Sequence, residues 1–99
     1  MKRTSADDLV SVLQEAQAFL KHPGNEFAWS SWEDAQEAIA EIDRFIRQIQ
    51  AGDYSCALDI SVLFAPTGPI QEVSLSSGWG QEFLELEEWF DRAAEIMKR

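Results

Sequence analysis

The chain has 99 residues, 45% of them hydrophobic, which suits one folded domain with a single core and argues against a disordered chain. Eighteen acidic residues against eight basic ones give a net charge of −10, so phosphate backbones and anionic membrane surfaces repel the chain. No apolar run reaches the roughly 18 residues of a membrane span. The basic start is followed by Asp7 and Asp8, whereas a secretory signal continues into an apolar stretch. The single Cys56 allows no internal disulfide. We therefore expect one domain over residues 1–99, located in the cytoplasm, with no direct contact to nucleic acid or membrane.

The first predicted element is a helix over residues 5–21. Its apolar residues recur at steps of four, three and four, as on one face of a helix, and they are Leu9, Leu13, Ala16 and Leu20. Thr4 and Ser5 are the expected caps at its start. The turn at 22–25, which contains Pro and Gly, is expected to end it.

A second helix is predicted from Ser31, its expected N-cap, to Ala51. Its apolar seam alternates steps of three and four, a spacing that packs against a neighbouring helix, and consists of Trp32, Ala35, Ile39, Ile42, Ile46 and Ile49. Gly52 follows as the expected C-terminal cap, because glycine adopts left-handed backbone angles without strain.

A β-hairpin is predicted next, because the hydrophobic period changes from helical to two. Apolar and small or polar residues alternate from Tyr54 to Phe64, which is typical of a strand with one buried face. The cluster at 65–69, with two prolines and a glycine around Thr67, suits a turn, and alternation resumes in a second strand at 70–76.

A third helix is predicted from about Gly80 to about Lys98. Its apolar residues again repeat at steps of three and four, and they are Phe83, Leu86, Phe90, Ala93 and Met97. The expected fold class is therefore α+β, in the order α-α-β-β-α, with the helices packed on one face of a small antiparallel sheet. The residues expected to be mostly buried are Leu13, Ile39, Ile42, Ile46, Leu58, Ile60, Val62, Phe83, Leu86 and Phe90.

The residue types that carry most enzyme chemistry are sparse. The only histidine, His22, lies in the predicted Pro-Gly turn, and Cys56 lies on the apolar side of the predicted strand as a small core residue. Gly78 and Gly80 lack the third glycine of a dinucleotide fingerprint and the lysine of a P-loop, and the carboxylates form no calcium-loop pattern. We therefore expect no catalytic, cofactor-binding or metal-binding residue, and we predict that the protein is not an enzyme.

Acidic residues and tryptophans are the candidates for recognition. Residues 48–91 contain no Lys or Arg, and the predicted second helix carries a like-charge ladder at intervals of four. Each such pair costs about 0.2–0.5 kcal/mol in isolation, which indicates a role other than helix stability. Trp29 and Trp79 lie in connections, where burial is the more common role and exposure makes a tryptophan a binding hot spot. The expected interaction residues are Glu33, Glu37, Glu41, Glu82, Glu85, Glu88, Trp29 and Trp79.

Three functions stay open at this point. The leading hypothesis is a non-enzymatic protein-binding module whose acidic surface engages a partner with a basic surface, as an immunity-type or inhibitor protein of a basic toxin or nuclease would. The second is a small-molecule binder or minor enzyme, with a pocket lined by Trp79, Trp89 and Tyr54. The third is an oligomeric accessory protein that self-associates through an open sheet edge.

Overall fold

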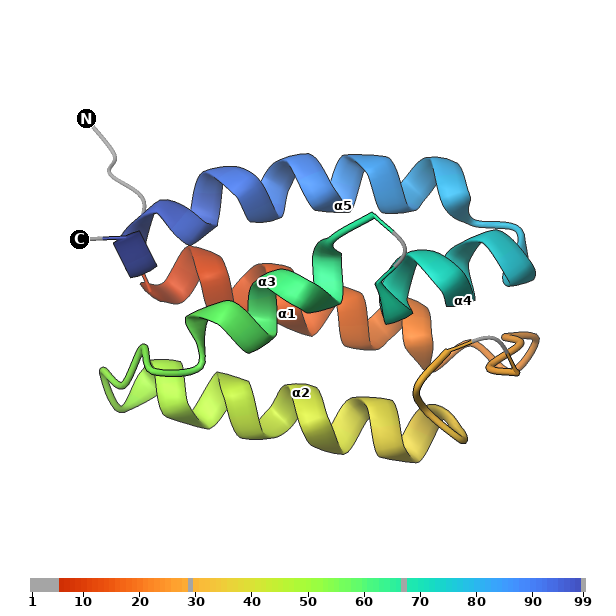
Figure 1. Ribbon diagram of the computed structural model, residues 1–99, viewed down its shortest axis with the longest axis horizontal. Helices are drawn as coiled ribbons and strands as arrows, with labels where there is room; N and C mark the ends of the chain where they lie inside the picture. The colour runs from red at the N-terminus through yellow and green to blue at the C-terminus, as the bar shows by residue number, and fades with distance from the viewer. Residues whose placement is uncertain (1–5, 29, 67, 99) are drawn as a thin grey trace.

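A computed structural model describes residues 6–28, 30–66 and 68–98 of the chain (Figure 1). These residues form helices and connections and contain no strand, so the predicted α+β fold with its β-hairpin is wrong. The elements in chain order are α1 (Ala6–Leu20), α2 (Ala35–Gln50), α3 (Ala57–Phe64), α4 (Pro69–Ser77), α5 (Gly80–Ala93) and the 3₁₀ helix η1 (Ala94–Lys98). None of the helices described is long and apolar enough to cross a bilayer.

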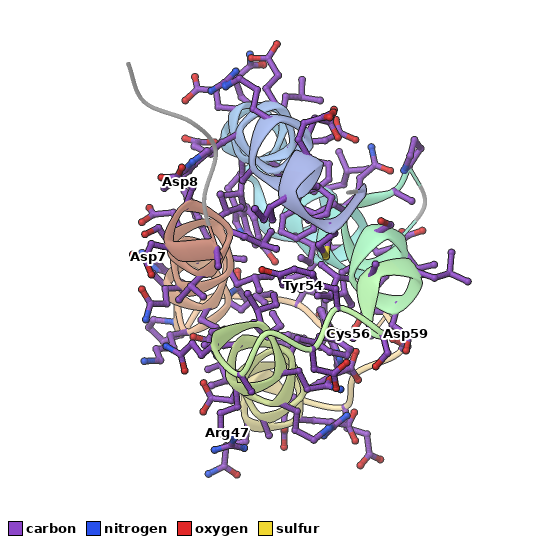
Figure 2. All side chains as sticks on the ribbon, turned by 90° about the vertical axis from the view of Figure 1, so that its left-hand side faces the viewer. Asp7, Asp8, Arg47, Tyr54, Cys56 and Asp59 are labelled. Atoms are coloured by element: carbon purple, nitrogen blue, oxygen red, sulfur yellow. The ribbon has the colours of Figure 1, made fainter. Side chains whose placement is uncertain are left out.

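The helices run alternately in opposite directions along the long axis of the molecule. In Figure 1, α1 runs one way, α2 returns, α3 and α4 together run in the direction of α1, and α5 returns beside α1. Viewed from one end in Figure 2, α1, α2, α3 and α5 surround a shared interior of side chains. The arrangement is that of an up-down-up-down helix bundle in which the third leg is broken into two short helices.

The first two helices confirm the predictions from helical periodicity. The four apolar residues of the first pattern are fully buried in α1. In α2, Ile42, Ile46 and Ile49 of the predicted seam are buried, whereas its earlier members Ala35 and Ile39 are only half-buried. Between these two helices lies one buried polar side chain, Gln17, whose amide Nε2 donates to the Ile39 carbonyl and to an Asp43 carboxylate oxygen, each at 3.0 Å. The expected caps Thr4 and Ser5 lie outside the described residues.

The two ends of α2 give different outcomes. The predicted start at Ser31 is wrong: the N-cap is Asp34, whose side chain accepts a hydrogen bond from the Glu37 N–H at 3.0 Å. Trp32 precedes the helix and is nevertheless buried. The predicted C-terminal cap is confirmed, because Gly52 has a φ of 81° and its N–H donates to the carbonyl of Ile49 at 3.0 Å.

Helix α3 replaces the first predicted strand. Cys56 at its N-cap and the helix residues Ile60, Leu63 and Phe64 are buried. In chain order they follow one another at steps of four, three and one, which is a helical spacing. Leu58 and Val62, which a strand would bury beside Ile60, are 75% and 52% exposed. The prediction that both belong to the core is therefore wrong.

Helix α4 replaces the second predicted strand, and the predicted turn at 65–69 separates two helices. Pro69 occupies the first turn of α4, where its missing N–H is not needed. Gly68 packs against the end of α3: a Cβ on it would lie 2.3 Å from the Val62 carbonyl oxygen, so only glycine fits there. Thr67 lies outside the described residues.

Helix α5 supplies the last side of the core. Phe83, Leu86 and Phe90 are buried as predicted, while Ile39 of α2 is only half-buried. The buried hydrophobic residues of all the legs form one cluster, so the bundle has one core. The third predicted helix is confirmed as far as Ala93, after which the chain tightens into the 3₁₀ helix η1.

Candidate functional site

The predicted ladder on the second helix is largely a capping structure. Glu33 precedes α2, and its N–H donates to the side chain of Glu37 at 2.8 Å, while the N–H of Glu37 donates to Asp34. Glu37 thus lies in the first turn, where the helix dipole favours a negative charge. Glu41 lies one turn further along and is half-buried. Helix stability therefore accounts for Glu37, and the inference that this ladder needs a recognition role loses its support.

The carboxylates of α5 have a different environment. Glu82, Glu85 and Glu88 are exposed, and the first two line a groove between α1 and α5 with a volume of about 210 Å³. This α1–α5 groove is lined by Glu15, Phe19, Glu82, Glu85, Leu86 and Trp89. Three carboxylates therefore surround two half-buried aromatic rings, and none of the described residues that line the groove is Lys or Arg.

Of the two tryptophans predicted for recognition, Trp29 lies outside the described residues. Trp79 lies in the turn between α4 and α5 and anchors it. The indole of Trp79 is 8% exposed, and its Nε1 donates to the side-chain oxygen of Asn25 at 2.8 Å. Its ring stacks on Phe19 of α1, with centroids 4.9 Å apart and an interplanar angle of 17°. Trp79 therefore holds Phe19 in place at one end of the α1–α5 groove.

The pocket predicted from Trp79, Trp89 and Tyr54 is not assembled. Trp89 lines the α1–α5 groove, and Trp79 lines a neighbouring hollow of about 270 Å³ that shares Phe19 and Glu82 with it. Tyr54 lies at the other end of the bundle, where α2 leads into α3 (Figure 2). The two tryptophans thus lie near one another, and the tyrosine does not join them.

Asp53 and Cys56 mark that other end of the bundle (Figure 2 labels Cys56). The carboxylate of Asp53 accepts hydrogen bonds from the Ser55 N–H at 3.0 Å and from the Gln48 amide at 3.2 Å, and these bonds hold its pKa below the ordinary value. Burial raises the pKa of the Cys56 thiol. The prediction that Cys56 is a small core residue is confirmed, although it caps a helix and does not lie in a strand.

A second groove, between α3 and α5, was not predicted. Phe64 and Phe90 stack at its base, with ring centroids 4.1 Å apart and an interplanar angle of 6°. Ser61 borders it on the α3 side, and Glu87 and Asp91 border it on the α5 side; its volume is about 300 Å³. The sequence pattern predicts that Glu87 and Asp91 lie on a helix. Because it predicts a strand for residues 54–64, it does not predict the helix α3 on the other side of this groove.

The part of the chain that the structure describes contains no group of three or more His, Cys, Asp or Glu residues arranged to hold a metal ion. Comparison of the chain with protein-family models, with curated proteins and with solved structures gives no match. The functional argument therefore depends on the surfaces described above.

Proposed function

We propose that this protein is a non-enzymatic module that binds a protein partner with a basic surface, and that the α1–α5 groove is its contact site. The observation that carries the proposal is the combination of Glu15, Glu82 and Glu85 around the rings of Phe19 and Trp89. Carboxylates attract Lys and Arg side chains, and an aromatic face attracts the same cations through its quadrupole. The groove thus offers two kinds of attraction to one kind of side chain.

The charge of the whole chain supports the same kind of partner. A net charge of −10 steers a basic protein toward the module and repels an acidic one, which raises the association rate and the specificity. An immunity-type or inhibitor protein that neutralises a basic toxin or nuclease has this requirement. A reduced, buried Cys56 fits a reducing compartment, and we place the module in the cytoplasm as part of the proposal.

A small-molecule site in the α1–α5 groove receives less support. The α1–α5 groove, at about 210 Å³, is smaller than most ligand pockets, which span roughly 300–1,000 Å³. Self-association through a sheet edge depended on the predicted hairpin, and the described residues form no strand.

The proposal is tested with a short unstructured peptide that contains Arg, Gly and Ser and no apolar residue. Amide and indole chemical shifts of the isotope-labelled protein are followed by NMR during the titration. We expect shifts to cluster at Glu15, Phe19, Glu82, Glu85 and Trp89, and we expect the affinity to fall as salt is raised.

A pair of charge-matched variants separates a site from general attraction. E82Q with E85Q removes two charges from the groove, whereas E33Q with E88Q removes two charges from positions that do not line it. We expect the first double variant to weaken peptide binding several times more than the second. Equal losses in both, or equal binding of a peptide with Glu in place of Arg, would show that the groove is not a site.

A further inference from the structure

We infer that the outer face of α3, together with the α3–α5 groove, is a second docking surface, and that it takes an amphipathic helical segment of a protein partner with apolar residues along one side and Lys or Arg beside them. This surface lies on the other flank of α5 from the α1–α5 groove. The inference goes beyond the proposed function and stands on different residues.

Helix α3 is apolar on its outer side as well as its inner side. Ile60, Leu63 and Phe64 face the core, yet Leu58 and Val62, which are four residues apart and so share one face, are 75% and 52% exposed. The exposed side of α3 also carries Asp59 and Ser61, so its apolar part is a narrow stripe. Nothing in the described part of the chain covers this face, and an exposed apolar patch of this kind marks an interaction surface.

The exposed stripe is continuous with the α3–α5 groove. Ser61 lines the groove and is the neighbour of Leu58 one turn away on the helix surface, so the stripe begins beside the groove, although Leu58 and Val62 do not line it. The base of the groove is the stacked pair of Phe64 and Phe90. A partner side chain that enters the groove therefore meets apolar atoms below and beside it.

The opposite edge of the groove is acidic. Glu87, Asp91 and Glu95 follow one another at steps of four along α5 and η1, and all of them line the groove. No Lys or Arg occurs among the described residues that line it. This edge fixes the side on which the partner carries its Lys or Arg residues.

The charges argue against a second copy as the occupant. A second copy carries a net charge of −10 itself, whereas a basic segment neutralises the edge that carries Glu87 and Asp91. A groove between two helices with apolar residues at helical spacing is the arrangement that receives a partner helix. A basic amphipathic helix satisfies both the apolar stripe and the acidic edge.

The test uses a synthetic peptide of about 18 residues, five helical turns, with Leu along one side and Lys on the other. NMR titration of the labelled protein is expected to shift residues from Leu58 to Ala65 and from Glu87 to Glu95. L58S combined with V62S removes the apolar stripe and is expected to weaken binding about tenfold or more. L75S is the control, because it removes an exposed apolar side chain from α4 that does not line the groove, and it is expected to leave binding unchanged.

Other outcomes overturn the inference. Equal weakening by L75S and by L58S with V62S, or equal binding of a peptide with Glu in place of Lys, would show that the stripe and the acidic edge do not recognise the probe. A dimer seen by sedimentation at high protein concentration and abolished by L58S with V62S would make a second copy the occupant. E82Q with E85Q is expected to leave this binding unchanged, so failure here and failure of the proposed function are distinguishable. The thermal midpoint of L58S with V62S should match that of the wild type, which shows that the variant is folded.

Discussion

Single alanine substitutions in α3 measure the helical arrangement of residues 57–64 directly. Ile60 is fully buried and Leu63 is 3% exposed, so truncation of either removes core contacts and should cost about 2–5 kcal/mol of the free energy of unfolding. Leu58 is already 75% exposed, and alanine is the best helix former, so Leu58→Ala should change that free energy by no more than about 0.5 kcal/mol. In a strand the order would differ, because Leu58 and Ile60 would share the buried side and Leu63 would lie on the other.

The assay is urea denaturation followed by far-ultraviolet circular dichroism. A domain of this size has a total stability of roughly 5–15 kcal/mol, so a loss of this magnitude moves the midpoint clearly while a folded baseline is still measurable. The slope of the transition should be the same for all three variants, because the surface exposed on unfolding barely changes. Losses of equal size for Leu58→Ala and Ile60→Ala, together with a stable Leu63→Ala, would refute the helix and restore the strand.

Three further outcomes follow from local geometry. Gly68→Ala places a Cβ against the Val62 carbonyl and should lower the free energy of unfolding by about 1–3 kcal/mol, whereas Gly24→Ala, which has open space around it, should leave it nearly unchanged; equal effects in denaturation would contradict the close approach. Asp34→Ala removes the side-chain cap of α2 and should cost about 1 kcal/mol by the same assay, and no loss would mean that the cap is not formed in solution. The thiol of Cys56 has a pKa above its ordinary value of 9.0 in the folded chain, so the protonated thiol stabilises the fold fully below about pH 9, and this stabilisation is lost as the pH rises through the folded pKa. Cys56→Ala should therefore remove this decline in the free energy of unfolding at alkaline pH. An unchanged decline would show that other groups cause it.

Periodicity predicts the long helices and fails for the short ones. Residues 6–20, 35–50 and 80–93 carry several turns of one pattern, so a helix is the only regular element that buries their apolar residues together. Residues 54–64 satisfy both periods: Cys56, Ile60 and Phe64 are apolar at steps of four, and with Leu58 and Val62 between them they also form a series at steps of two. β-branched residues in that segment favour a strand in isolation, and packing against the core of the bundle decides in favour of the helix.

The candidate sites show the same division between local and long-range information. The exposure of Glu82 and Glu85 follows from the pattern of their own helix, but Glu15 and Phe19 join them only because α1 packs beside α5. The cap of α2 was within reach of the sequence, because Asp34 followed three residues later by Glu37 is a known signal for a helix start. Ser31 is a residue type that also favours this position, but it lies three residues before the N-cap.

The buried amide of Gln17 has a consequence for how many ways this chain can fold. The buried side chains of α2 range in size from Ala38 to Phe45, so sliding the helix past α1 by one turn would already disturb their packing. Such a slide would carry the Ile39 carbonyl and the Asp43 carboxylate away from the Gln17 amide and leave that amide buried without partners. The Gln17 hydrogen bonds therefore add a polar requirement to the apolar packing, and both favour the same alignment of α1 and α2.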